Sequence, residues 1–357
     1  MNKKLIISPG ETIKELLETY NYTQKDLANK LGMELKTVNE ILNGKGVITF
    51  ETAIKLGTIF NMPASFWNNL EFNYRKDLKD VEEAERAEQD YRKIETAYKE
   101  LVKRNKIDLS KEKANKVATF KSFMEVADLD DIEAEYEMAI ACRKAQIKEF
   151  NIISLMTWIQ CGIKKTREAI INNFDKEKVL KMIPEIKKLT LFDNQQEALI
   201  KLKELCADCG IVLSYEKAFP NTGINGIAKW VTTEKAFIQV SDRGKKADTF
   251  WFTFMHELGH IVKGKKKIFF IDEECIKSEG DEEKIANDFA MKMLIEDKKG
   301  YEKLKNHWTI DAIKEFAKEN DIHEGIVAGM ICHDNNIYDN VGLNRMRRKL
   351  DFDMVRS

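Results

Sequence analysis

The chain has 357 residues, 43% of them hydrophobic, which is enough for two or three packed domains. Its 59 basic and 60 acidic residues leave a formal net charge of −1, which excludes a chain that binds nucleic acid simply as a polycation. Residues 1–10 lack the apolar segment of a signal peptide, and no later stretch has the length of a membrane span, so we expect a cytoplasmic protein without membrane contact. Six cysteines without a dense pairing pattern agree with a reducing compartment.

Residues 1–75 have the spacing of five short helices. Thr23 and Asp26 form a capping box at the start of the second helix, and Gly32 ends that helix. A third helix follows at about 36–42, so the segment has the arrangement of a helix-turn-helix. The alternative is a helical module that binds another protein.

The pattern Thr-Gln-x-x-Leu-Ala from Thr23, followed by Leu-Gly and then by Thr-Val-x-x-Ile-Leu-Asn-Gly from Thr37, resembles the Cro/repressor-type helix-turn-helix of the XRE family. The continuation through residues 48–74 is similar to the HigA antitoxin subtype. This resemblance implies that the third helix lies in the major groove of operator DNA and that Gln24 contacts phosphate. The residues that we expect at base edges are Lys36, Thr37, Asn39 and Asn43.

Charge limits how strongly this first segment can bind DNA. Up to Arg75 it contains nine basic and eight acidic residues, a balance of only about +1. Strong attraction to phosphate needs several uncompensated cations on one face, so we expect the protein to bind operator DNA as a homodimer.

The middle of the chain is helical and carries no chemical motif. Residues 76–106 form a charge-rich helix with one apolar stripe, which is typical of a spacer or dimerisation helix. Pro184 is expected to kink or restart the helix that contains it. The further helices are expected at about 111–127, 131–144, 152–163, 164–173 and 176–188.

After a helix at about 194–208, the periodicity changes to that of short strands at 211–215, 226–231 and 236–240. The edge strand of such a small sheet can bind an extended peptide by main-chain pairing. Cys206 and Cys209 form a lone C-x-x-C in this region, for which we favour small buried residues over a redox or metal role.

His256 and His260 stand four residues apart in an apolar stretch, so both imidazoles project from one face of a helix. Two neutral histidines supply most of the protein ligands of a catalytic zinc ion, which takes about three. Glu257, next to the first histidine, is placed to act as a general base. The alternative is a core helix whose histidines bond to backbone carbonyls.

The third ligand is expected from the following helix, in which residues 285, 286, 289, 290, 293 and 294 mark one apolar face. Glu283 begins this face, and Asn287, one turn later, is placed to bond a ligand histidine. Glu282 is the alternative ligand. Acidic residues in a first helical turn are also common partners of the helix dipole.

Residues 243–248, 250–253, 256–261 and 283–290 together resemble the ImmA/IrrE metallo-endopeptidases, and weaker likeness extends over nearly the whole chain. The resemblance implies Zn2+ held by His256, His260 and Glu283, with Glu257 as the base. Lys263 departs from the family, in which another histidine is frequent at that place. For His323 the alternatives are a residue that enters the cleft and stabilises an oxyanion, a cap of the helix that follows it and a merely exposed histidine.

We therefore expect an α+β, mostly helical protein. Its expected regions are a helix-turn-helix domain at 1–75, a helical spacer or dimerisation region at 76–190, a zinc peptidase domain with a small sheet at 191–300 and a helical extension at 301–357. The predicted function is a transcriptional regulator whose endopeptidase domain cleaves a protein partner of repressor or antitoxin type. The alternative is a HigA-type antitoxin or repressor that binds a cognate toxin and whose zinc domain senses or binds a protein without significant proteolysis.

Overall fold

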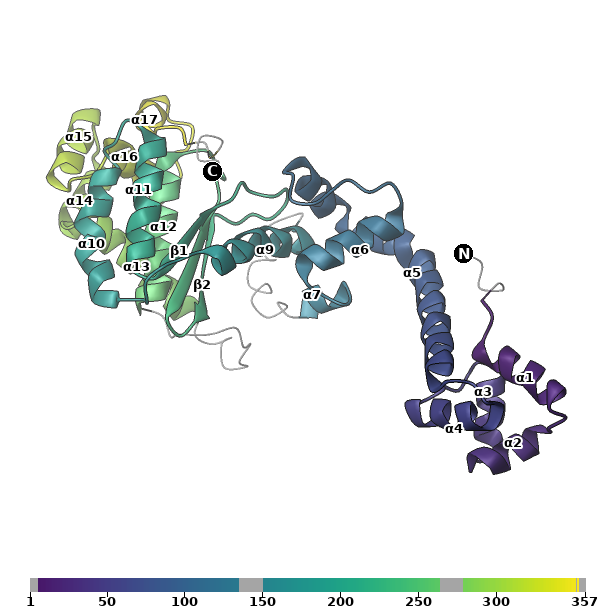
Figure 1. Ribbon diagram of the computed structural model, residues 1–357. Coiled ribbons are helices and arrows are strands. Elements are labelled where there is room, and N and C mark those ends of the chain that lie inside the picture. Colours follow the sequence, from purple (N-terminus) through teal and green to yellow (C-terminus); the bar gives the residue numbers. More distant parts are fainter. Residues whose placement is uncertain (1–5, 135–149, 264–278, 351, 353–357) are drawn as a thin grey trace. The chain divides into compact units, whose positions relative to one another are not determined.

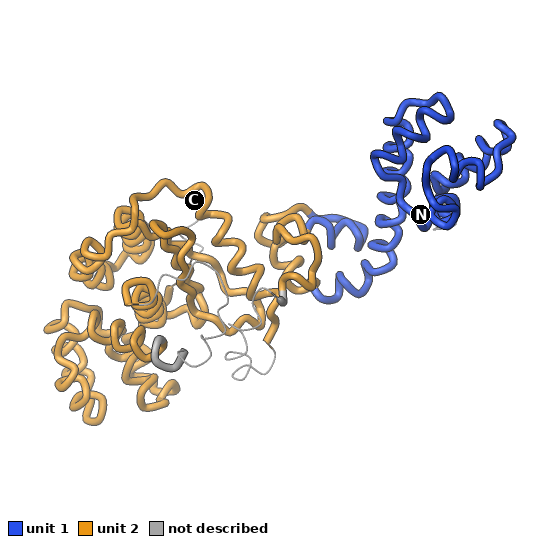
Figure 2. The backbone as a smooth tube through the Cα atoms, turned by 90° about the horizontal axis from the view of Figure 1, so that it is seen from below, with its two compact units in different colours: residues 1–93, 109–119 blue, residues 94–108, 120–357 orange. Residues whose placement is uncertain are grey.

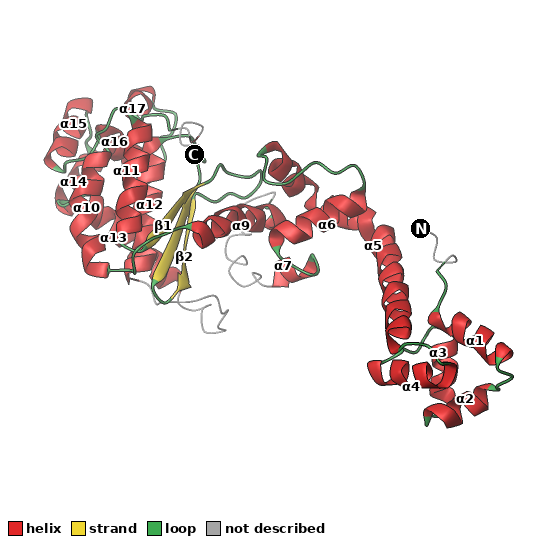
Figure 3. Ribbon diagram, in the orientation of Figure 1, coloured by secondary structure: helices red, strands yellow, loops and turns green. Residues whose placement is uncertain are grey.

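The computed structural model of the chain describes residues 6–134, 150–263, 279–350 and 352 (Figure 1). The described chain is mostly helical and contains one three-stranded sheet, which confirms the predicted α+β fold (Figure 3). It divides into two compact units (Figure 2): unit 1 comprises residues 1–93 and 109–119, and unit 2 comprises residues 94–108 and 120–357. No described helix combines the length and the apolar character that a membrane span needs.

Unit 1 begins with four helices, α1 (Pro9–Thr19), α2 (Gln24–Leu31), α3 (Leu35–Leu42) and α4 (Phe50–Phe60). The predicted capping box is present: the backbone N–H of Asp26 donates to Thr23 Oγ1 at 3.2 Å, and that of Thr23 donates to Asp26 Oδ2 at 2.9 Å. Gly32 ends α2 in the left-handed conformation, with φ of 67°. The helices pack around a common apolar core that includes Ile13, Leu27, Leu31, Val38, Leu42, Leu56 and Trp67.

The fifth helix differs from the prediction. Helix α5 runs without interruption from Ala64 to Lys103, so the short fifth helix and the separate spacer helix that we expected are one element of 40 residues. Neither glycine nor proline occurs between its ends, and ion pairs four residues apart brace its surface. These pairs are Arg75–Glu71, Arg92–Glu88 and Lys99–Glu95. The helix therefore contributes residues to both units.

The middle helices are α6 (Lys113–Met124), α7 (Asp130–Ala134), α9 (Ile152–Glu168), α10 (Lys176–Leu189) and α11 (Gln195–Asp208). The two helices expected at 152–163 and 164–173 are wrong, because α9 is continuous over most of that span. Helix α10 runs through Pro184 without a restart. The greater part of the helix expected at 131–144 lies outside the described residues.

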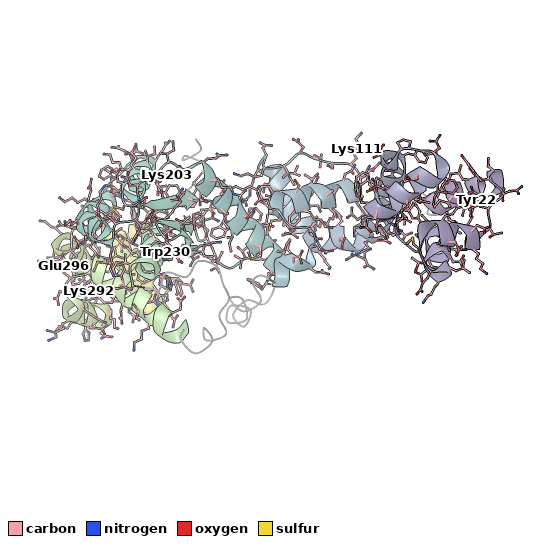
Figure 4. All side chains as sticks on the ribbon, turned by 60° about the horizontal axis from the view of Figure 1, so that its bottom comes forward. Tyr22, Lys111, Lys203, Trp230, Lys292 and Glu296 are labelled. Carbon is pink, nitrogen blue, oxygen red and sulfur yellow. The ribbon has the colours of Figure 1, made fainter. Side chains whose placement is uncertain are left out.

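The sheet consists of β1 (Ile211–Tyr215), β2 (Gly226–Thr232) and β3 (Lys235–Val240) in the order β1-β3-β2. Strand β1 pairs with β3 in parallel and β2 pairs with β3 antiparallel, so β2 is an edge strand. One face of the sheet carries Trp230, labelled in Figure 4, which is buried and packs edge-on against Phe174. The opposite face carries the buried Phe237 and Gln239, and Gln239 donates to the carbonyl of Trp158 in α9 at 2.7 Å. The sheet thus lies between α9 on one side and the main apolar core on the other.

That core is organised around α12 (Ala247–Lys263), which packs against the sheet and against α13 (Glu279–Leu294) and α16 (Glu324–Asp334) of the helices that follow it. The other later helices are α14 (Lys298–Asn306), α15 (Ile310–Glu319) and α17 (Val341–Met346), as Figure 1 shows. The chain after α17 returns to the start of α12, where Arg347 forms a 2.7 Å ion pair with Asp248. Both partners are largely buried, so the C-terminal segment belongs to the core that positions α12.

Candidate metal centre and nucleic-acid interface

The histidine pair lies on one face of α12. The remaining faces of this helix bury Phe254, Met255, Leu258 and Ile261, which hold the helix in the core. His256 and His260 are only partly buried, so their rings reach the surface of that core. Their Nε2 atoms lie 3.0 Å apart. The four-residue spacing therefore brings the two nitrogen atoms close enough to bind one ion.

Helix α13 crosses α12 closely at Gly259. A Cβ atom at this position would lie 3.1 Å from Ala286 Cα and 3.1 Å from the Phe289 ring. A larger residue would push the helices apart, so the glycine is what permits the close approach. The approach places Glu283 against the histidines, with Oε2 at 3.2 Å from His256 Nε2 and Oε1 at 3.4 Å from His260 Nε2. These three side chains, on two helices, can hold a metal ion.

Asn287 fixes the orientation of the first histidine. Its Oδ1 lies 2.8 Å from His256 Nδ1. Because an amide oxygen only accepts, the proton of the neutral ring belongs on Nδ1, and the lone pair of Nε2 then points toward Glu283. The hydrogen bond that we predicted for Asn287 is therefore present, and it leaves His256 in the form that a metal ligand requires.

The electrostatics of the three groups favour a positive charge between them. When the rings of His256 and His260 are protonated, the hydrogen bonds that they donate hold the pKa of Glu283 far below its ordinary value. Burial acts to lower the pKa of His256, but the hydrogen bond to Glu283 and the charge of Glu257 outweigh it and raise this pKa. The cluster thus attracts a cation.

Glu257 lies on the sheet side of α12, where it is 6% exposed. Its neighbour is Gly226, the first residue of β2. A Cβ atom at Gly226 would lie 2.6 Å from Thr253 Cγ2, 2.9 Å from Glu257 Cγ and 3.0 Å from Glu257 Oε1. The start of the edge strand therefore lies so close to Glu257 that no side chain fits between them, a feature that the strand pattern alone did not indicate.

The predictions for the apolar face of α13 and for His323 are confirmed in some respects and wrong in others. Ile285 is 47% exposed, so its place in the apolar face of α13 is wrong, while Ala286, Phe289, Ala290 and Leu294 are buried as expected. His323 caps α16, because its Nδ1 accepts from the backbone N–H of Gly325 at 2.9 Å. The capping interpretation of His323 therefore holds, and its Nδ1 atom is engaged by the backbone at the start of α16. The side chain of Glu282 lies outside the described residues.

Cys206 and Cys209 are both buried and carry free thiols. Burial raises the pKa of each thiol. A protonated buried thiol is a poor nucleophile, so the interpretation of these cysteines as small core residues holds.

In unit 1, the exposed side of α3 forms a shallow depression. Three of the predicted DNA contacts lie in it, namely Lys36, Asn39 and Asn43. Leu35, Glu40 and Lys45 complete the lining. Lys45 was not among the predicted positions, although its place immediately after the Asn43-Gly44 helix stop puts it beside α3. Thr37 is partly buried on the same helix, and Gln24 is the exposed first residue of α2.

These two regions define the class of the protein. A family model described as "Helix-turn-helix" matches residues 13–67, and one described as "IrrE N-terminal-like domain" matches residues 206–328. Both resemblances predicted from the sequence are thereby confirmed.

Curated relatives match the chain in part. An uncharacterized HTH-type transcriptional regulator of Haemophilus influenzae is 35% identical over 91 residues, which is 25% of this chain and 83% of the relative. Antitoxin HigA-1 of Vibrio cholerae is 39% identical over 70 residues, 19% of this chain and 66% of the antitoxin. The uncharacterized regulator YbaQ of Escherichia coli is 30% identical over 112 residues, 31% of this chain and 92% of the relative. The chain therefore belongs to the helix-turn-helix transcriptional regulators, and it additionally carries an IrrE-like peptidase domain. The predicted boundaries at residues 75, 190 and 300 remain predictions.

Proposed function

We propose that this regulator is also a zinc-dependent endopeptidase that cleaves a protein partner of repressor or antitoxin type. The observation that carries the proposal is the meeting of His256, His260 and Glu283 beside the buried Glu257. A site that only stabilises a fold has no use for such a base, whereas hydrolysis of a peptide bond requires one.

The three donors fit zinc in chemistry and in spacing. Zinc takes imidazole nitrogen and carboxylate oxygen in tetrahedral sites with bonds of about 2.0–2.2 Å, which sets neighbouring donors roughly 3.3 Å apart. The three separations in this cluster are 3.0, 3.2 and 3.4 Å. When bound there, zinc would supply a Lewis acid that polarises the scissile carbonyl and acidifies a water molecule.

The residues of the chain supply metal binding, proton transfer and substrate binding. His256 and His260 present lone pairs, and Glu283 contributes the negative charge of the site. Glu257 is placed to take a proton from the attacking water and to deliver it to the leaving amine. Strand β2 is an edge strand of the described sheet and could pair through its main chain with an extended segment of the substrate, and Gly226 would bring that segment next to Glu257.

The DNA-binding half would direct this activity to one operon. We infer that α3 reads operator DNA through the depression that contains Lys36 and Asn39. Because basic and acidic residues nearly cancel up to Arg75, a homodimer on two half-sites is the arrangement that would give sufficient affinity.

The test is the substitution Glu257→Gln in the native host, with Asp288→Asn as the matched control. Both changes replace a carboxylate by an amide, and Asp288 lies exposed on α13 beyond Asn287. Glu257→Gln should leave DNA binding and metal content intact and lower the cleavage rate by about 10²–10⁴, because glutamine cannot accept the proton. Comparison of the proteomes should show a protein that accumulates only in this variant. If none accumulates and derepression under stress is unchanged, the peptidase proposal is wrong.

A second candidate is a HigA-type antitoxin and repressor whose metal domain only senses or binds a protein. The similarity to antitoxin HigA-1 favours it. This candidate predicts a small toxin-like gene beside that of the regulator. It also predicts growth arrest when the regulator is depleted, with full rescue by the Glu257→Gln variant.

A further inference from the structure

The turn that follows α3 folds back onto the helix. The backbone N–H of Gly44 donates to the carbonyl of Ile41 at 3.0 Å, and those of Lys45 and Gly46 donate to the carbonyl of Glu40 at 2.9 and 2.8 Å. Gly44 has φ of 70°, which other residues adopt only with strain. The side chain of Lys45, in the middle of this turn, lines the same depression as Lys36 and Asn39.

Helix α5 holds this turn through the guanidinium group of Arg75. Its Nη1 donates to the carbonyl of Gly44 at 3.3 Å, and its Nη2 donates to the carbonyl of Gly46 at 2.6 Å. These carbonyls belong to the residues on either side of Lys45. The carbonyl groups on either side of Lys45 thus both accept from the planar guanidinium group of Arg75. These two hydrogen bonds restrict the direction in which the Lys45 side chain leaves the backbone.

The guanidinium group of Arg75 is in turn held by Glu71. Its Nε donates to Glu71 Oε1 at 2.6 Å, and Glu71 is 7% exposed. A buried carboxylate needs a partner, so the orientation of the guanidinium group follows from that of Glu71. Tyr74 adds a third contact, with its hydroxyl 3.4 Å from the carbonyl of Gly44.

We propose that Arg75 is a positioning residue for DNA binding: oriented by Glu71, it sets the turn after α3 so that Lys45 meets a phosphate group at the edge of the groove read by α3. The proposal rests on the DNA-binding function proposed above and adds three residues to it, Arg75, Glu71 and Lys45. It differs from two simpler roles of Arg75, namely direct contact with phosphate and mere neutralisation of Glu71.

Arg75→Lys separates these roles, because lysine keeps the charge but a single ammonium group cannot reproduce the fork. The experiment measures binding of the full chain to a labelled duplex from the region upstream of its own gene and to a random duplex of equal length, over a range of salt concentrations. The variants are Arg75→Lys, Glu71→Gln, Lys45→Ala and the double variant Arg75→Lys with Lys45→Ala. The control is Lys79→Ala, which removes an exposed cation one turn further along α5. Thermal melting of each variant reports folding.

We expect Lys45→Ala to lower the slope of log K against log salt by about one, as for one lost phosphate contact. Arg75→Lys should lower affinity for the upstream duplex about as much, Glu71→Gln should follow it, and the double variant should be no worse than Arg75→Lys alone. Lys79→Ala should bind like the wild type.

Two results would overturn the proposal. Wild-type affinity of Arg75→Lys would show a direct or purely electrostatic role, and additive losses in the double variant would show that Arg75 does not act through Lys45. A wild-type chain that does not prefer the upstream duplex would instead reject the DNA-binding function itself. If Arg75→Lys has a lower melting temperature than the wild type, the same test of additivity is made with Glu71→Gln and with the double variant of Glu71→Gln and Lys45→Ala.

Discussion

The Nδ1 atom of His256 on α12 lies 2.8 Å from the Oδ1 atom of Asn287 on α13. This contact joins residues that are 31 positions apart, and it determines which nitrogen of the ring carries the proton. The nitrogen that remains free faces His260 and Glu283. One hydrogen bond between two helices therefore prepares the candidate centre for a metal ion.

Loss of this bond should weaken metal binding without removing a ligand. Asn287→Ala frees the His256 ring to rotate and to change tautomer, and we expect zinc affinity to fall about 10- to 100-fold, the usual cost of such a partner. Asn287→Asp keeps the acceptor and should bind at least as tightly as the wild type. Competition with a chromophoric chelator measures both, with Asp288→Asn as the control. Equal affinity of Asn287→Ala and wild type would contradict this role.

The ligands themselves should be indispensable. Purified wild-type protein is expected to hold one zinc ion per chain, and His256→Ala and Glu283→Gln should lose most of it, because two remaining donors form a weak site. Metal content is measured by plasma mass spectrometry after dialysis. Glu282→Gln is the matched control and should keep its zinc. A full complement in His256→Ala and Glu283→Gln together would refute the assignment.

Recognition of DNA should depend on the exposed face of α3. Lys36→Ala and Asn39→Ala remove side chains that line the depression, and each should reduce the preference for the upstream duplex by about 1–3 kcal/mol, the value of a base contact. Fluorescence anisotropy with specific and random duplexes gives this preference. Lys14→Ala, which removes a charge on α1, should weaken binding to both duplexes alike, if at all. Unchanged preference in both α3 variants would place the interface elsewhere.

Stability should respond to acid through Glu125 in unit 2. Hydrogen bonds from Arg167 and then Lys164 lower the pKa of Glu125 from 4.5 to about 2. Because the folded-state pKa is the lower one, the stabilisation is complete above about pH 4.5 and is lost as the pH falls toward 2. Glu125→Gln should cost at most about 1 kcal/mol at pH 7, since these groups are substantially exposed to solvent.

This cost should shrink as the pH falls. Urea unfolding of wild type and Glu125→Gln at pH 7 and pH 3.5 measures it, and Glu177→Gln, an exposed carboxylate of α10, serves as the control. A difference between wild type and Glu125→Gln that stays constant with pH would exclude the ion pair as its source.

Features that depend on near neighbours in the chain could be predicted from the sequence. The capping box of Thr23 and Asp26, the three strands and the histidine pair of α12 all arise within a few residues, where spacing alone decides which side chains meet. The boundary errors are of the same kind. The sequence pattern predicts separate helices within residues 64–103 and within residues 152–168, yet each span is one helix, because no residue there interrupts the backbone hydrogen bonds.

Contacts between distant segments were decided by the tertiary structure. The sequence by itself determined that His256 and His260 share a face and that an acidic residue near 283 is a candidate partner. Only the packing of α13 across Gly259 brought Glu283 within 3.4 Å of both rings, and only the sheet placed Gly226 against Glu257. The hold of Arg75 on the turn after α3 is of the same type. The reason is physical: such contacts depend on the rotation and separation of packed elements, which are set by the whole core and not by any local pattern.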